Sequence, residues 1–234
     1  MEIFNQKSSS LDDNSHWMSV SDLMAGLMMV FLFIAIALMR ESLLERDKIK
    51  EIAVAYQEKQ VAIYNALNEE FESELNKWDA AIDKDTLTFT FNSPEVLFEA
   101  GSKKLRVSYK QLLNDFFPRY MKVLLPYHGS IEQVLIEGHT SSLWTGLDEN
   151  AAYFKNMELS QERTRSVLDY VYYLPDVKVY QTWVKLNVAA VGLSSSKLVY
   201  SKGSEDSEKS RRVNFRVITD ADIQIKRILR DSQE

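Results

Sequence analysis

One carboxylate stands inside a long apolar run near the amino terminus. From Trp17 to Met39 the chain carries Asp22 and no other Asp, Glu, Lys or Arg. A run of about 23 residues is long enough to cross the hydrocarbon core of a bilayer with modest tilt. A carboxyl group about one turn inside such a helix costs a few kcal/mol, so it usually has an internal partner or takes part in ion movement. The pattern therefore favours Asp22 as a group that takes up and releases a proton.

Three alternative interpretations of this run are open. A core helix of a soluble domain would need a second apolar segment to pack against, and the sequence has none. A cleaved signal peptide would need a basic start, whereas residues 1–16 carry three acids and one lysine. Asp22 could also lie in the hydrated headgroup region. We predict a tail over residues 1–16 and a retained membrane helix over residues 17–39.

Composition excludes several classes of function. The net charge of −6 over 234 residues argues against a nucleic-acid partner, which would require a basic face. The absence of cysteine excludes disulfides and thiolate metal sites. The histidines, at positions 16, 128 and 139, lack the spacing of metal ligands. We therefore expect no metal and no cofactor.

The charges around the apolar run bear on its orientation. Arg40, Arg46, Lys48 and Lys50 follow the run closely, whereas Lys7 is the one cation before it. Basic residues near the end of a membrane helix favour the cytoplasmic side. Taken alone, this count places the carboxyl-terminal part of the chain in the cytoplasm.

The segment after the apolar run has the pattern of a long helix. Residues 40–85 are rich in charge and contain neither proline nor glycine. A single stripe of mostly apolar residues from Ile49 to Ile82 repeats about every 3.67 residues, close to an eleven-residue repeat. We predict a spacer helix over residues 40–85. Its stripe could mediate self-association or pack on a following domain, and the sequence leaves both open.

Residues 86–219 alternate between strand and helix patterns. Strands are predicted at 87–91, 131–137, 185–191 and 212–218, and helices at 104–125, with a kink at Pro118, and at about 160–173. A polar loop is expected over 138–155. This order predicts an α+β fold, a mixed sheet with helices on one face. Residues 220–234 would form a tail, in which 221–230 is a short helix or a frayed end.

Four segments in this region resemble one known family. They are Val96–Ser102, Gly138–Thr140, Asn156–Arg163 and Ser210–Phe215, and they occur in the order of the OmpA-like peptidoglycan-binding domain. Each segment is weak by itself, whereas four in order make a specific signal. The resemblance covers about 130 residues and implies a domain that binds the cell wall.

The resemblance implies a binding site for the wall peptide. The N-x-x-L-S-x-x-R motif of the family maps onto Asn156, Leu159 and Arg163, and the loop residues Thr140 and Ser141 complete the set. A planar guanidinium can grip a carboxylate through two hydrogen bonds. In the family an aspartate stands at the position of Ser141 and recognises the diaminopimelate amine. Because Ser141 has no carboxylate, we expect a lower affinity for the wall peptide than in members that carry the acid. We expect Asn156 and Arg163 to be exposed at the start of their helix.

The amino-terminal half resembles a second family. Trp17 and Asp22 form the W-x-x-x-x-D pattern that opens the membrane helix of MotB-like stator subunits, and the long spacer and the loop at residues 138–144 are most similar to the MotB-like component of Zorya anti-phage defence systems. The resemblance implies a homodimer within a ring of MotA- or ZorA-like membrane subunits. It also implies Asp22 as the proton carrier and a single-pass inner-membrane protein, with a cytoplasmic amino terminus and a periplasmic domain bound to peptidoglycan.

Other functions are compatible with parts of the sequence. A flagellar stator subunit and a static OmpA-like wall tether share most of these features. A hydrolase using Glu137, His139 and Ser141 is disfavoured, because Ser141 follows His139 by two residues and no nucleophile turn is evident. We therefore predict that the chain is not an enzyme.

Overall fold

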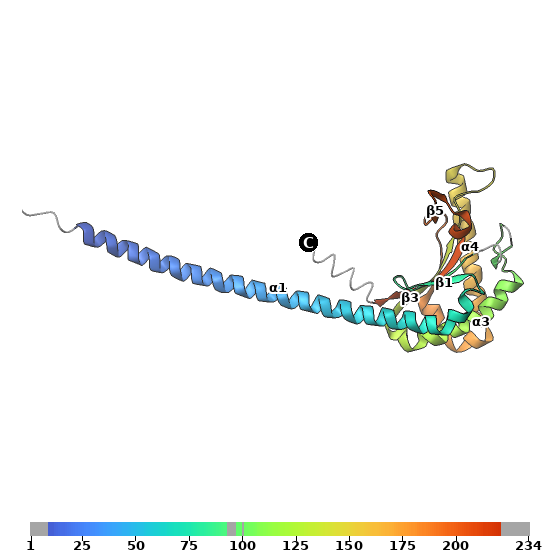
Figure 1. The fold of residues 1–234 in the computed structure, drawn as a ribbon, viewed down its shortest axis with the longest axis horizontal. Helices are drawn as coiled ribbons and strands as arrows, with labels where there is room; N and C mark the ends of the chain where they lie inside the picture. Colours follow the sequence, from blue (N-terminus) through green and yellow to red (C-terminus); the bar gives the residue numbers. More distant parts are fainter. Residues whose placement is uncertain (1–8, 93–96, 100, 221–234) are drawn as a thin grey trace, which may run out of the picture. The chain divides into compact units, whose positions relative to one another are not determined.

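The computed structural model describes residues 9–92, 97–99 and 101–220, and of residues 9–19 and Tyr56 it describes the backbone alone. The chain divides into two compact units, residues 1–53 and 54–234. In the first unit the described residues belong to one helix, α1, which runs from Ser9 to Leu75 and continues into the second unit (Figure 1).

The apolar run forms part of α1. From Val20 to Met39 its side chains are exposed, including the large residues Phe31 and Phe33. Among the described residues, α1 is the one helix that is long and apolar enough to span a membrane. An exposed apolar surface on all sides of a helix is typical of a segment that lies in lipid. The predicted membrane helix over 17–39 therefore corresponds to a continuous helical segment.

The last turns of α1 pack in the core of the second unit. Ile63, Leu67 and Phe71 are fully buried there. The predicted stripe thus packs on the chain's own domain over this length, which was one of the two alternatives. α1 ends at Leu75, ten residues before the predicted end, and strand β1 occupies Ala80–Asp83. In the turn between them Asp79 has φ +47°, a left-handed conformation in which an α-helix cannot continue.

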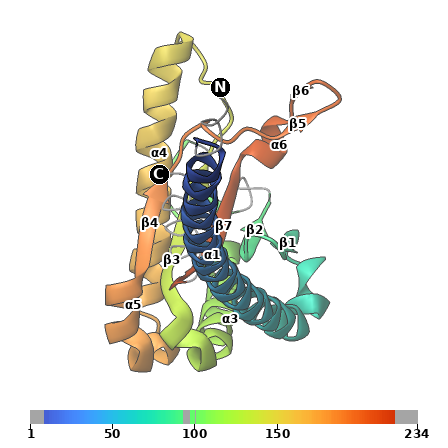
Figure 2. The same cartoon turned by 90° about the vertical axis from the view of Figure 1, so that its left-hand side faces the viewer.

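The second unit is built on one five-stranded mixed sheet. The strand order is β1–β2–β7–β3–β4, where β2 is Thr88–Phe91, β3 is Ile131–His139, β4 is Val188–Gly192 and β7 is Arg212–Thr219. β3 and β4 are parallel, and the other neighbours are antiparallel. Figure 2 shows this order across the sheet. The predicted mixed sheet is confirmed.

An aromatic core joins one face of the sheet to the helices. The ring of Phe71 on α1 lies 5.4 Å from that of Phe89 on β2 and 5.3 Å from that of Phe116 on α3, which runs from Val107 to Leu124. Phe116 also lies 5.1 Å from Phe215 on β7. α4, Glu149–Tyr172, contributes the buried Val167 to the same core. The helices therefore cover one face of the sheet, as the sequence predicts.

Two further predicted boundaries differ from the observed ones. α4 begins at Glu149, where a helix was expected from about residue 160. The first three residues of the predicted strand 185–191 belong to a short helix, α5 (Gln181–Asn187), so β4 begins at Val188. The remaining short elements are η1 (Leu125–Ser130), η2 (Pro175–Tyr180), β5 (Tyr200–Ser201), β6 (Ser204–Glu205) and α6 (Ser207–Ser210). The predicted segment 221–230 lies outside the described residues.

Candidate functional site

The motif residues lie in the middle of α4. The Asp148 side chain caps the helix by accepting a hydrogen bond from the backbone N–H of Ala151 at 2.9 Å, so the helix starts well before the motif. The expectation that Asn156 and Arg163 lie at the start of their helix is therefore wrong. The two residues are seven apart, which is about two turns and roughly 10.5 Å of rise, and they share one side of the helix. Leu159, between them on that side, is half-buried.

Two glycines bring strands β3 and β4 against α4. A Cβ atom on Gly138 would lie 2.7 Å from Cγ2 of Thr164 and 2.9 Å from the backbone oxygen of Ser160. A Cβ atom on Gly192 would lie 2.3 Å from the backbone nitrogen of Gln161. Such distances exclude any larger residue without movement of the backbone. This close packing places the loop after β3 beside the motif face of α4.

Asn156 fastens that loop to the helix. Its side chain is 3% exposed, and its Nδ2 donates to the backbone oxygen of Ser141 at 3.1 Å and to that of Leu143 at 3.5 Å. The expected exposure of Asn156 is therefore not observed. A buried amide that satisfies two backbone carbonyls positions the loop. Its contribution to binding would be indirect.

Thr140 and Ser141 are also buried. The N–H of Thr140 donates to the oxygen of Ser194 at 2.9 Å, and its hydroxyl is buried without a hydrogen-bond partner in the described part of the chain. Ser141 is 9% exposed and meets Asn156 through its backbone oxygen. The structure thus brings Thr140, Ser141 and Asn156 together, mainly through backbone atoms.

Arg163 is a half-buried cation with no carboxylate partner. Its Nε donates to the backbone oxygen of Ser102 at 3.0 Å, and its guanidinium lies 4.8 Å from the ring centre of Phe98. Within the described residues, no protein atom accepts a hydrogen bond from its two Nη atoms. Burial, together with the nearby charge of Arg211, lowers the pKa of Arg163 to about 10. An unpaired, partly desolvated guanidinium favours the binding of an anion.

A carboxylate from a distant part of the chain holds the same loop. Glu205 at the end of β6 accepts hydrogen bonds from the backbone N–H of Ser142 at 3.0 Å and from the Ser142 hydroxyl. The sequence analysis did not identify Glu205. The two residues are 63 positions apart, and no local motif indicates the contact.

A buried polar network occupies the other face of the sheet. Nδ2 of Asn214 lies 3.3 Å from Oε2 of Glu137 and 3.1 Å from Nε2 of His139, so the amide can donate to both. Burial is the largest influence on the pKa of His139 and lowers it, although the neighbouring Glu137 acts in the opposite direction. Burial alone would raise the pKa of Glu137, but interactions with His139, Asn214 and Arg216 outweigh it and lower that pKa. No hydrogen bond joins Ser141 to His139 among the described residues, so these two side chains do not form a nucleophile–base pair in this structure.

Asp22 lies on α1 in the first unit. Its side chain is exposed, and a Cβ atom added to Gly26, one turn further along, would meet no other described part of the chain within 4 Å. The side chain of Trp17 lies outside the described residues. The helix therefore presents Asp22 with a small residue beside it, which leaves space for another helix to approach.

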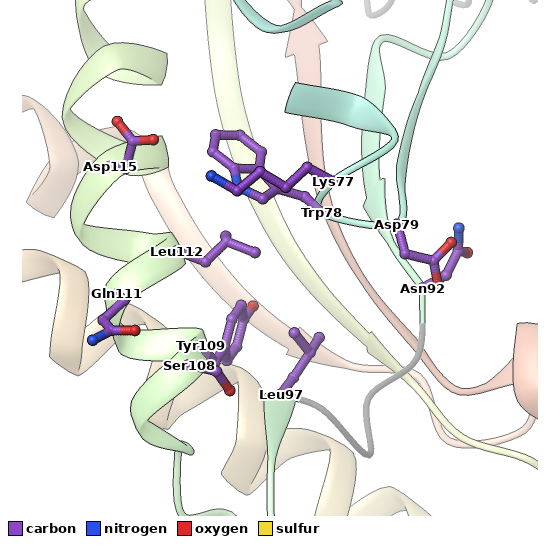
Figure 3. A pocket seen from close by; sticks show the side chains of 10 residues that line it. All are labelled: Lys77, Trp78, Asp79, Asn92, Leu97, Ser108, Tyr109, Gln111, Leu112 and Asp115. Atoms are coloured by element: carbon purple, nitrogen blue, oxygen red, sulfur yellow. The ribbon is translucent and has the colours of Figure 1, made fainter. Parts of the chain in front are cut away.

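A cavity of about 450 Å³ lies elsewhere in the second unit (Figure 3). Trp78, Tyr109 and Leu112 form part of its wall, and Asp79 and Asp115 lie at its edge. None of the residues predicted from the family motif lines it. The cavity is therefore separate from the candidate site on α4.

Fold and site together define the class of the protein. A mixed sheet with helices on one face, following a helix that is long and apolar enough to span a membrane, is the fold expected of an OmpA-like domain. Within that class, the chain belongs to the family of Zorya protein ZorB. It is 54% identical to Zorya protein ZorB of Escherichia coli (strain Crooks) over 221 residues, which are 94% of each chain.

Solved structures with a similar fold are more distant in sequence. A MotB-like protein from Desulfovibrio vulgaris has a TM-score of 0.49 and 20% identity, covering 72% of this chain and 94% of its own. The cell wall anchor of the type VI secretion system from Pseudomonas aeruginosa has a TM-score of 0.46 and 21% identity, covering 66% and 97%. The periplasmic domain of Helicobacter pylori MotB has a TM-score of 0.41 and 19% identity, covering 62% and 85%. No model of a known protein family matches the chain.

Proposed function

We propose that the chain is the wall-anchored subunit of a proton-driven inner-membrane motor that acts in Zorya anti-phage defence. One observation carries the proposal: the match to Zorya protein ZorB extends over 94% of both chains, so it includes the apolar helix as well as the domain. In this proposal the amino terminus is cytoplasmic and the second unit is periplasmic.

The wall-binding part of the proposal is supported by Arg163. Its guanidinium is half-buried and unpaired in the described structure, and its position is fixed by Ser102 and Phe98. A fixed guanidinium binds a carboxylate through two hydrogen bonds at little cost in side-chain entropy. The free carboxylate of a peptidoglycan stem peptide is such a ligand. Asn156, Thr140 and Ser141 would shape the loop beside it.

The motor part of the proposal concerns Asp22. Two copies of the chain would place two Asp22 side chains inside a ring of MotA- or ZorA-like membrane subunits. Each carboxylate would take up a proton from the periplasmic side and release it to the cytoplasm. Moving one charge through about 100 mV supplies about 2.3 kcal/mol, which is a usable step for rotating a ring.

The test of the motor is the variant Asp22→Asn. This change keeps the size and hydrogen bonding of the side chain and removes the group that titrates. We expect the complex to assemble normally and protection against phage, measured by plaque counts, to be lost. Asp22→Glu keeps the acid on a longer arm and should retain a little activity. Asp47→Asn, on an exposed position of the same helix beyond the apolar run, is the matched control and should protect fully.

The same test distinguishes the motor subunit from the alternative, a static wall tether. If Asp22 served structure alone, Asn would be harmless, because it avoids burial of a charge in lipid. Full protection by the Asn variant, with an intact complex in a pull-down, would disprove the ion-carrier role. The neighbouring genes distinguish defence from motility.

A further inference from the structure

Two opposite charges near the motif face of α4 lack a partner of opposite charge. Arg163 has no carboxylate within ion-pair distance, and Glu205 has no Lys or Arg within that distance, among the residues that the structure describes. Both side chains are partly buried. Because partly desolvated charges are costly when unpaired, each favours an external partner.

A chain of contacts links the two charges. The Ser207 hydroxyl donates to Oε1 of Glu205 at 3.3 Å, and Nε of Arg211 donates to the backbone oxygen of Ser207 at 3.0 Å. The charge of Arg211 in turn acts on the pKa of Arg163. Glu205 also accepts a hydrogen bond from Ser142, and the preceding residue, Ser141, accepts one from Asn156. Glu205 therefore holds the loop that Asn156 joins to α4, the helix that carries Arg163.

The carboxylate of Glu205 is fixed in place. Two donors of Ser142 and the hydroxyl of Ser207 occupy three of the about four acceptor positions that a carboxylate offers. These donors are uncharged, so they orient the carboxylate without forming an ion pair with it. One acceptor position remains for a further donor. A fixed anion with a vacant position selects a cationic group.

We propose that Glu205 is a specificity-determining residue, which receives the ammonium group of a wall peptide whose carboxylate is held by Arg163. The proposal rests on the proposed wall-binding function. The proposal explains why Ser141 can stand where the family has an aspartate, because Glu205 on β6 would supply the carboxylate instead. The ligand is thus a peptide that carries both a free carboxylate and a free amine.

The test compares two soluble wall fragments with the full-length chain in detergent. The first is a disaccharide tripeptide that ends in diaminopimelate with its amine free, and the second is the same fragment with that amine acetylated. Titration calorimetry should show about fivefold tighter binding of the first fragment, the size expected for a partly exposed ion pair. Glu205→Gln should weaken the first fragment about fivefold and leave the second unchanged.

Three controls make the outcome decisive. Glu208→Gln, an exposed acid in the next helix, should bind both fragments as the unmodified chain does. Ser141→Asp added to Glu205→Gln should restore the preference for the free amine. Arg163→Ala should weaken both fragments.

The contrary results are distinct. Equal weakening of both fragments by Glu205→Gln would overturn the proposal, because it would mean that Glu205 merely positions the loop. Equal affinity of the unmodified chain for the two fragments would overturn it as well. Absence of binding of either fragment by the unmodified chain would instead refute the wall-binding function on which the proposal depends.

Discussion

Arg163 and Asn156 share one side of α4 and have different environments. Asn156 is buried and supplies hydrogen bonds to the loop after β3, whereas Arg163 keeps two nitrogen atoms without a partner in the described structure. The first arrangement contributes to stability and the second to binding. A substitution at each position should therefore have a different effect.

We predict that Asn156→Ala lowers the free energy of unfolding by about 1–3 kcal/mol, because it leaves buried carbonyl groups without donors. Arg163→Ala should change the free energy of unfolding by less than about 1 kcal/mol, because the loss of one hydrogen bond is offset by the removal of an unpaired charge. The same variant should no longer bind isolated sacculi. Denaturant unfolding and a sacculus pull-down measure the two effects. Arg165→Ala, an exposed cation on the same helix, is the control and should alter neither. Undiminished pull-down by the Arg163 variant would move the site elsewhere.

The network of Glu137, His139 and Asn214 predicts a dependence of stability on pH. His139 has an ordinary pKa of 6.5 when unfolded and a lower pKa in the fold, because burial disfavours its charged form. The unfolded chain therefore binds more protons below about pH 6.5. The stabilising contribution of neutral His139 is present above that pH and is lost as the pH falls through the folded pKa. Glu137, whose pKa is lowered from 4.5, extends the loss to more acidic pH.

We expect the chain to be less stable at pH 5.5 than at pH 7.5, and His139→Gln to reduce this difference. Denaturant unfolding at both pH values provides the comparison. His128→Gln, at an exposed position, is the matched control and should retain the full difference. An equal pH dependence in the His139 variant would show that the effect originates from other groups.

Helix α1 contributes to both units. Between Val20 and Met39 its apolar side chains are exposed, and its last turns supply Leu67 and Phe71 to the aromatic core. Arg119 on α3 strengthens this packing, since its Nε donates to Oε1 of Glu70 at 2.6 Å and its guanidinium lies 4.9 Å from the ring of Phe71. The end of α1 is therefore part of the folded domain.

Phe71→Ala should lower the free energy of unfolding by about 3–5 kcal/mol, the usual cost of removing a buried aromatic ring. Glu72→Ala, one residue along and exposed, should change it by less than about 0.5 kcal/mol. Denaturant unfolding monitored by tryptophan fluorescence compares the two, since Trp78 lies 5.9 Å from Phe71. Similar small effects in both variants would contradict the packing of this segment on the sheet.

The number of cations on each side of the apolar run and the proposed function indicate opposite orientations of the chain in the membrane. Four cations follow the apolar run within about a dozen residues, and one precedes it. The count alone favours a cytoplasmic second unit. Binding to peptidoglycan requires that unit to be periplasmic. Orientation is therefore the sharpest test of the proposed arrangement.

The natural chain contains no cysteine, so a single added thiol reports its location. We expect Ser201→Cys, at an exposed position of β5, to react with a membrane-impermeant maleimide in cells whose outer membrane has been opened. Ser8→Cys, in the amino-terminal segment, should react after lysis alone. The reverse pattern would exclude contact of the domain with the cell wall.

Features that depend on local periodicity could be predicted from the sequence. The apolar run around Asp22, the alternation of Thr88–Phe91 and the helical spacing in α3 correspond to observed elements, because each follows from which side chains avoid water. The order of strands and helices then indicated the mixed sheet. The four family segments indicated Arg163, and the structure gives it an environment suited to an anion.

Contacts between residues that are distant in the sequence could not be predicted in this way. The burial of Asn156 depends on the approach of β3 to α4, which is permitted by glycines at 138 and 192. The contact of Glu205 with Ser142 depends on a turn that returns the chain after 63 residues. The early end of α1 follows from pairing of β1 with β2. Contacts of this kind are set by packing between elements, and no spacing along the chain records them.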